Sequence, residues 1–208
     1  MEKEQFFSAL KELKETTKKK FDQSVDFIIN LKNFDIKKEN LNFFVTLPYE
    51  TKKKRICAFL ENKNELFDKC ITSKEFENWQ KKDIKKLVKD YDFFVANAKL
   101  MPAIALRFGK ILGPAGKMPS PQLGIIQTED KKTMMELKEK ISKTIRIRTK
   151  EPSIKVMIGK QSMPEEQLAE NALAVYNAVL AALPRKKENI SNVIIKFTMS
   201  KPFKIRLE

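Results

Sequence analysis

Residues 107–121 read RFGKILGPAGKMPSP and hold three of the chain's five glycines and three of its nine prolines. Glycine opens backbone conformations that are closed to other residues, whereas proline fixes φ and removes an N–H donor. This density predicts a loop of defined shape rather than a helix or a strand. Its lysines, Lys110 and Lys117, either bind an anion or face water on a rigid connector, and residue types alone do not separate these two interpretations.

Gly116 and Lys117 are similar to the end of a P-loop, the phosphate cradle of many nucleotide hydrolases. A P-loop needs glycine five positions before Gly116 and a Ser or Thr after the lysine, but this chain has Ile111 and Met118 there. Pro114 also removes a backbone donor that such a cradle would use. The spacing therefore disfavours nucleotide hydrolysis.

The chain has 208 residues, and its 42 Lys and Arg outweigh 27 Asp and Glu to give a formal charge of +15. This balance favours a polyanionic partner, either nucleic acid or an acidic membrane surface. A membrane anchor is disfavoured because the longest apolar stretch, Ala172–Leu183, contains Asn177 and is shorter than the ~20 residues that span a bilayer. The first residues lack the apolar core of a secretion signal, so we expect an intracellular protein with no membrane partner.

Histidine is absent from the sequence, which excludes catalytic triads, imidazole bases and histidine-containing metal sites. Cys57 and Cys70 are too few and too widely spaced for a zinc cluster, and in a reducing compartment buried free thiols are the simpler interpretation. We expect no catalytic residue, no metal and no cofactor.

The first fifty residues predict one helix, over 3–19, and two strands, over 21–31 and 41–47. Ser24 and Asp26 alternate with the apolar side of the first strand and are expected to face away from the core. The expected core-facing residues are Phe6, Leu10, Leu13, Val25, Phe27, Ile29, Leu31, Phe43, Val45 and Leu47.

From Ile56 to Lys150, short apolar strands alternate with helical stretches, which predicts a parallel sheet with flanking helices. The expected strands are 56–60, a short one at Ile71, 93–96 and 144–150. The expected helices lie near Glu65 and over 74–90, 101–108 and 129–143.

The last segment predicts a strand over 154–158, a helix and a final strand. Ser162 and Glu165 have the spacing of a capping box at the start of that helix. Its apolar stripe, and the core-facing side of the final strand, comprise Leu168, Ala172, Val175, Val179, Val193, Ile195 and Phe197.

Neither end of the chain could bury enough surface alone, so we expect the two ends to pack together. The predicted fold class is an α+β domain built from residues 1–52 and 152–208, with an α/β domain, Rossmann-like and based on a parallel sheet, inserted at 53–151. Two linkers would then join the domains and permit a hinge motion.

On this packing, polar side chains of two strands share one solvent-facing side of the α+β sheet. An RNA site needs cations for phosphates, small polar groups for 2′-OH groups and base edges, and an apolar side chain to pack on sugar or base. An ordinary solvated sheet face would carry similar residues. The candidate set is Lys20, Phe21, Ser24, Asp26, Lys196, Thr198, Met199, Ser200 and Lys201.

Four motifs make the chain resemble the ribosomal protein L1 family: Gly113–Pro121, Thr198–Pro202, Phe21–Asp26 and Val45–Pro48. The resemblance implies a cytoplasmic, ribosome-bound protein of the large subunit, without catalysis, that binds large-subunit rRNA. It further implies that the protein forms the mobile stalk beside the exit-site tRNA, contacts other ribosomal components and assists release of deacylated tRNA.

The same resemblance implies that Lys20, Phe21, Ser24, Asp26, Thr198 and Met199 bind rRNA, with position 200 allowing a close approach to it. This chain has Ser200 where the family usually has Gly, and Ala115 where many members have Arg. The loop residues would then shape the inserted domain near the hinge: Gly113, Pro114, Gly116, Lys117, Met118 and Pro119.

Two other functions remain open from the sequence. An RNA-binding translational regulator that recognises its own mRNA would use the same surface. A nucleotide-using enzyme could be built on the inserted α/β domain, although fold type alone does not establish function.

Overall fold

The computed structural model describes residues 3–16, 21–36, 39 and 41–205. Its contacts divide the chain into two compact units, and the chain passes between them twice. Unit 1 comprises Met1–Lys52 and Lys143–Glu208, and unit 2 comprises Lys53–Ser142.

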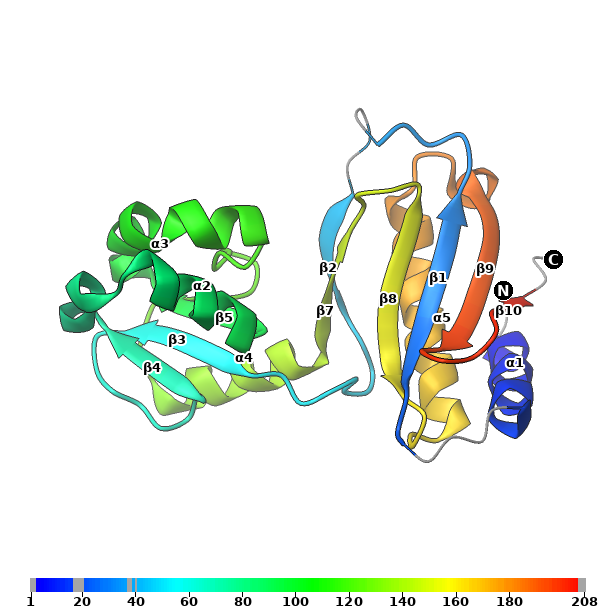
Figure 1. Cartoon of the computed structure of the whole chain (residues 1–208), viewed down its shortest axis with the longest axis horizontal. Helices are drawn as coiled ribbons and strands as arrows, with labels where there is room; N and C mark the ends of the chain where they lie inside the picture. The colour runs from blue at the N-terminus through cyan, green and yellow to red at the C-terminus, as the bar shows by residue number, and fades with distance from the viewer. Residues whose placement is uncertain (1–2, 17–20, 37–38, 40, 206–208) are drawn as a thin grey trace. The chain divides into compact units, whose positions relative to one another are not determined.

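Unit 1 is built on an antiparallel sheet in which segments far apart in sequence alternate (Figure 1). Strand β1 (Ser24–Leu31) lies between β8 (Ser153–Lys160) and β9 (Ile190–Phe197), and β10 (Phe203–Ile205) extends the sheet beyond β9. Alternate residues of β1 and β9 are buried, the pattern of a sheet with one covered face. Strands from both ends of the chain therefore lie in one sheet.

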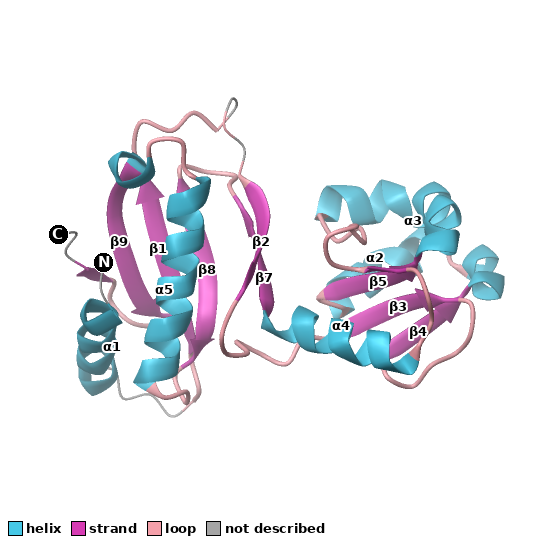
Figure 2. Ribbon diagram, turned by 180° about the vertical axis from the view of Figure 1, so that it is seen from behind, coloured by secondary structure: helices cyan, strands magenta, loops and turns pink. Residues whose placement is uncertain are grey.

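Helices α1 (Lys3–Thr16) and α5 (Glu165–Ala182) cover one face of this sheet (Figure 2). Both contribute apolar residues at helical spacing to a single core. A short helix, η3 (Lys186–Asn189), precedes β9. Every core-facing residue named from the sequence in this unit is buried except Phe43, which is partly buried against the core.

Strand β7 (Thr144–Arg148) pairs antiparallel with β2 (Asn42–Thr46) in unit 1, although we expected residues 144–150 to complete the inserted unit. The side chains of Val45 and Ile147 join the core of unit 1, and the N–H of Thr149 donates to the carbonyl of Leu41 at 3.0 Å. The apolar pattern predicted the strand correctly but did not indicate its partner.

Unit 2 contains the predicted parallel sheet, in the order β4 (Lys69–Thr72), β3 (Ile56–Leu60), β5 (Phe93–Asn97) and β6 (Ile125–Ile126). All five residues of β3 are buried because helices lie on both faces of the sheet. Helices α2 (Lys81–Asp90) and α3 (Met101–Ala115) cover one face and α4 (Lys131–Lys143) the other (Figures 1 and 2). The short helices η1 (Ser73–Asn78) and η2 (Ala98–Leu100) follow β4 and β5.

Residues 109–115 continue helix α3, so the prediction of a loop beginning near Arg107 was wrong. Ile104, Phe108 and Leu112 are four residues apart and fully buried, and this burial outweighs the low helix propensity of glycine and proline. Pro114 lies in the last turn of the helix, where it lacks the N–H that would donate to the carbonyl four residues earlier, and the helix ends one residue later. Gly116 then ends the helix with φ +70°, in a Schellman motif.

Three further local predictions were wrong. The segment 61–68 near Glu65 forms turns, because the Asn64 side chain accepts the N–H of Leu66 at 2.9 Å. The helix expected over 74–90 divides into η1 and α2. Ser162 makes no capping box, because both its N–H and its hydroxyl donate to the Asp22 carboxylate.

No helix in the described part of the chain is both long and apolar enough to cross a membrane.

Candidate nucleic-acid interface

The ends of β1 and β9 bring most of the predicted RNA-binding residues together. Asp26 pairs with Lys196 across the two strands, and the N–H of Thr198 donates to the Ser24 carbonyl at 3.1 Å. We call this group the sheet-end surface; its described residues are Phe21, Ser24, Asp26, Lys196, Thr198, Met199, Ser200 and Lys201. Lys20 lies outside the described residues.

Gln23 holds the sheet-end surface in place. Its side chain is 1% exposed, its Oε1 accepts the N–H of Met199 at 3.0 Å, and its Nε2 donates to Gln161 Oε1 at 3.2 Å. The Gln161 N–H in turn donates to the Gln23 carbonyl at 2.7 Å. One buried amide thus joins the chain before β1 to the segments after β8 and β9. Sequence reasoning missed Gln23, although it is a polar residue in phase with the core-facing side of β1, beginning at Val25.

Ser200 closes the turn that follows β9. Its Oγ accepts the N–H of Phe197 at 2.8 Å, and its own N–H donates to the Phe197 carbonyl at 3.0 Å. Among the described residues other than glycine, only Asn33 and Lys186 have positive φ, so serine at position 200 requires no left-handed backbone. Ser200 therefore shapes this turn without backbone strain.

Phe21, which precedes β1, and Met199, in the turn after β9, expose large apolar side chains, at 56% and 63% of their surface. The backbone of Met199 is held by Gln23, so its side chain faces water at a fixed point of the chain. An exposed ring and a thioether beside lysines can pack against a base or sugar while the ammonium groups contact phosphates.

Asp26 is the half-buried carboxylate of the surface. Burial raises the pKa of Asp26, and the positive charge of Lys196 opposes this shift. Asp22 differs. Burial raises its pKa, but hydrogen bonds from the N–H and hydroxyl of Ser162 outweigh this effect, so the pKa of Asp22 lies below its usual value. Burial thus disfavours the ionised form of Asp26, whose carboxylate can accept a hydrogen bond from a 2′-OH or a base amino group.

We expect Asp26→Asn to raise the free energy of unfolding at neutral pH. The folded-state pKa of Asp26 lies above its unfolded-state pKa, which is about 3.9. Protonation of Asp26 therefore stabilises the folded protein, and this stabilisation is complete only below the unfolded-state pKa. That contribution is lost as the pH rises through the folded pKa. Urea unfolding at several pH values should show the gain of the variant over the wild-type protein shrinking as the pH falls through the folded pKa of Asp26, and reaching its minimum below about 3.9. A gain independent of pH would contradict this account.

The residues Gly113–Pro119 form no anion-binding loop. Lys117 Nζ donates to the carbonyls of Val88 and Tyr91 at 2.6 and 2.7 Å, so its ammonium group caps the last turn of α2. Gly113 and Pro114 are helical, Met118 packs on the core of unit 2, and Pro119 is buried. Lys117, Met118 and Pro119 therefore contribute to the stability of unit 2, whereas Gly113 and Pro114 are exposed positions of α3.

We expect Lys117→Met to destabilise unit 2 by about 1–3 kcal/mol, because two carbonyls at the end of α2 lose a charged donor. Fluorescence of Trp79, the only tryptophan, follows the unfolding of unit 2 in urea. Lys110→Met, at an exposed position of α3, is the matched control and should change stability little. Unchanged stability of Lys117→Met would show that this cap is unimportant.

A carboxylate of the chain itself fills the position where Rossmann-like folds usually bind phosphates. Glu129 accepts the backbone N–H groups of Glu61 and Asn62 at 2.8 and 3.3 Å and the amide of Asn97 at 2.7 Å, beyond the carboxyl ends of β3 and β5. These hydrogen bonds lower the pKa of Glu129 although burial raises it. An anionic ligand would have to displace Glu129, which argues against a nucleotide-using enzyme at this switch point.

The cysteines offer no reactive site. Cys57 is fully buried, and burial raises the pKa of its thiol to about 12; burial also raises the pKa of the half-buried Cys70 thiol. The described residues contain no group of three or more His, Cys, Asp or Glu that could hold a metal ion.

Comparisons with known proteins agree on one family. The model of the ribosomal protein L1p/L10e family matches residues 13–201. Large ribosomal subunit protein uL1 of Nanoarchaeum equitans is 36% identical over 91% of this chain and 94% of its own length. The uL1 proteins of Thermococcus kodakarensis, 34% identical over 98% of both chains, and of Methanocaldococcus jannaschii, 33% identical over 100% of this chain and 98% of its own length, are similarly related. Because this match spans most of the chain and the relatives are at least 33% identical over nearly their whole length, the chain belongs to the ribosomal protein L1p/L10e family.

Proposed function

We propose that the chain is a structural constituent of the large ribosomal subunit that binds large-subunit rRNA through the sheet-end surface of unit 1. The names of its relatives support the ribosomal role. In this role it acts without catalysis, in the cytoplasm, among other ribosomal components.

One observation carries the rRNA-binding part of the proposal: Phe21 and Met199 both expose large apolar side chains, and the Met199 backbone is held by the buried Gln23, two residues after Phe21. A backbone that is already held in place loses little further freedom when Met199 binds RNA. Lys196, Lys201 and Lys20 add phosphate contacts, whereas Ser24, Asp26 and Thr198 supply hydrogen bonds to sugar and base edges.

The second part of the proposal concerns the stalk. Because unit 2 is connected to unit 1 by two chain crossings, at Lys52–Lys53 and Ser142–Lys143, unit 1 can remain on the rRNA while unit 2 moves. In this proposal the protein forms the mobile stalk beside the exit-site tRNA and assists release of deacylated tRNA.

Sequencing of the RNA that co-purifies with the tagged protein from cells tests the proposal. We expect one segment of large-subunit rRNA to dominate, and we expect this enrichment to fall in a Thr198→Ala, Met199→Ala variant. Enrichment of the protein's own mRNA instead would favour the translational regulator. Recovery of RNA without preference for either would contradict both functions.

A further inference from the structure

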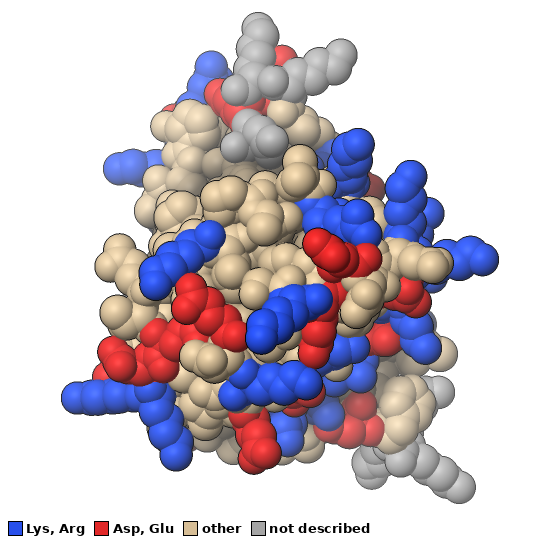
Figure 3. Space-filling view, turned by 90° about the vertical axis from the view of Figure 1, so that its left-hand side faces the viewer, with Lys and Arg blue, Asp and Glu red and all other residues tan. Residues whose placement is uncertain are grey.

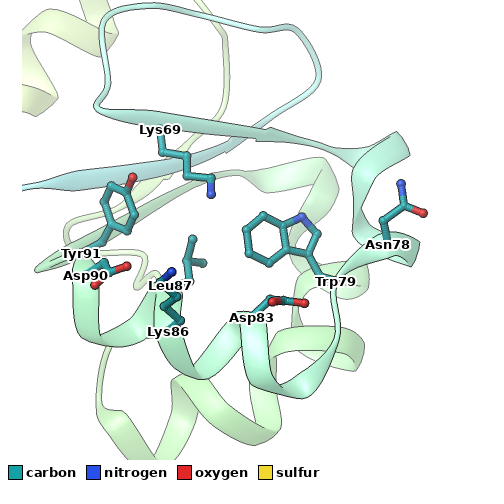
Figure 4. Close-up of a pocket in the computed structure, with 8 residues that line it drawn as sticks. All are labelled: Lys69, Asn78, Trp79, Asp83, Lys86, Leu87, Asp90 and Tyr91. Atoms are coloured by element: carbon teal, nitrogen blue, oxygen red, sulfur yellow. The ribbon is translucent and has the colours of Figure 1, made fainter.

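A pocket of about 470 Å³ opens on unit 2 between β4 and α2 (Figure 4). Its lining runs along α2, from Asn78 and Trp79 before the helix to Tyr91 after it, and includes Lys69 at the start of β4 but not Glu129. Its volume falls within the range of about 300–1,000 Å³ typical of small-ligand sites. None of its lining residues belongs to the sheet-end surface of unit 1.

Two aromatic side chains face the pocket, each with a cation beside its ring. Lys69 Nζ lies 4.5 Å from the centre of the Trp79 ring, and Arg55 Cζ lies 5.7 Å from that of Tyr91. Figure 4 shows Lys69 reaching down from β4 and Lys86 reaching up from α2 into the space between the two rings. Sites for single-stranded nucleic acid combine such π-faces, on which bases stack, with cations for the phosphates.

The carboxylates of Asp83 and Asp90 also line the pocket. Asp83 Oδ2 accepts the N–H of Gln80 at 3.3 Å in the capping box of α2. Carboxylates repel free phosphate but accept hydrogen bonds from base amino groups and ribose hydroxyls, whereas Lys69 and Lys86 would repel a purely cationic ligand. The mixed lining therefore fits a nucleotide, which carries a phosphate, hydrogen-bond donors and an aromatic base together.

Helix α2 carries a row of lysines that leads away from the pocket. They make no ion pair with any residue in the described part of the chain, and lysines four residues apart repel one another on a helix. A polyanion lying along α2 would relieve this repulsion. The exposed lysines are Lys81, Lys82, Lys85, Lys86 and Lys89.

Basic and acidic side chains are interspersed on the face of the molecule shown in Figure 3. Because the charges are mixed, such a surface has no uniform positive potential and attracts RNA mainly through individual contacts. A pocket for a base beside a row of lysines can supply such contacts.

We propose that this pocket binds one unpaired nucleotide of an RNA strand whose phosphates follow the lysines of α2. The base stacks on Trp79 in place of the Lys69 ammonium group, and the displaced Lys69 contacts the adjoining phosphates together with Lys86. This second RNA site belongs to unit 2 and does not depend on rRNA binding by unit 1.

Trp79 is the only tryptophan, so its fluorescence reports on the pocket directly. The full-length protein is titrated with an unstructured six-nucleotide RNA and, separately, with adenosine monophosphate. We expect saturable quenching by the oligonucleotide and binding of the mononucleotide that is weaker by at least about tenfold, since it lacks the further phosphates. Lys69→Gln should weaken oligonucleotide binding about fivefold or more, while Lys110→Gln, which removes the same charge from α3, should weaken it less than about twofold.

Absence of saturable quenching, or equal losses in the two lysine variants, would overturn the proposal. Binding of adenosine monophosphate as tight as that of the oligonucleotide would do so too, because it would indicate a site for free nucleotides. Trp79→Leu, checked for folding by circular dichroism and assayed with labelled RNA, should also lose binding by about tenfold or more. A Phe21→Ala, Met199→Ala variant should retain the quenching, so failure of the unit 1 site can be distinguished from failure of this one.

Discussion

Replacing Asn171 by leucine should lower the free energy of unfolding of unit 1 by about 3 kcal/mol or more. Asn171 is fully buried in α5, and its amide serves three backbone groups. Its Oδ1 accepts the N–H of Tyr49 at 3.1 Å, and its Nδ2 donates to the carbonyls of Tyr49 and Ile158 at 3.2 and 2.9 Å. Leucine has a similar size but leaves all three groups without a partner.

Urea unfolding followed by circular dichroism measures this loss, and Trp79 fluorescence shows separately whether unit 2 remains folded. The matched control is Asn177→Leu, at an exposed position of the same helix, for which we expect almost no change. Equal stability of the two variants would show that the Asn171 hydrogen bonds do not secure the chain between β2 and unit 2.

The double variant Phe21→Ala, Met199→Ala should bind the stalk segment of large-subunit rRNA about 10- to 100-fold more weakly than the wild-type protein. Both side chains are more than half exposed, so their removal takes little from the core. Their loss should therefore appear in the dissociation constant and not in the free energy of unfolding.

Phe7→Ala is the control for this variant, since Phe7 is also an exposed aromatic residue but lies on α1. Its affinity for the same RNA should equal that of the wild-type protein. A double variant that binds as tightly as Phe7→Ala would remove Phe21 and Met199 from the site.

Patterns within one strand or helix were sufficient to predict much of unit 1. The alternation from Val25 to Leu31 and the stripe from Leu168 to Val179 correspond to buried positions, because the periods of strand and helix determine which side chains can face a core. The pairing of β7 with β2 was not predictable in the same way. The apolar alternation of β7 would suit a strand in either unit, and the strand with which it pairs is decided by contacts between residues distant in sequence.

The sequence also could not show that residues 109–115 are helical. Gly109, Gly113 and Pro114 each disfavour a helix locally, but burial of Phe108 and Leu112 on the sheet outweighs that cost. Similarly, Lys117 was a plausible anion ligand until its direction was known, because only the fold brings the end of α2 within its reach.

The candidate site was predicted in part. The strand phase placed Ser24 and Asp26 on the open side, and the pairing of β1 with β9 brings Lys196 and Thr198 beside them. Gln23 was missed because burial of a polar side chain on the core-facing side of a strand is unfavourable unless that side chain has hydrogen-bond partners. The partners, Gln161 and Met199, are known only from the fold.

The most direct test of the account is the binding of the purified protein to a transcribed stalk fragment of large-subunit rRNA and to an unrelated hairpin of equal length, over a series of salt concentrations. We predict that preference for the stalk fragment persists as salt rises, because contacts by Phe21, Thr198 and Met199 do not depend on counterion release. Equal binding to both RNAs with the same steep salt dependence would contradict the account. It would mean that the charge of +15 alone explains the affinity.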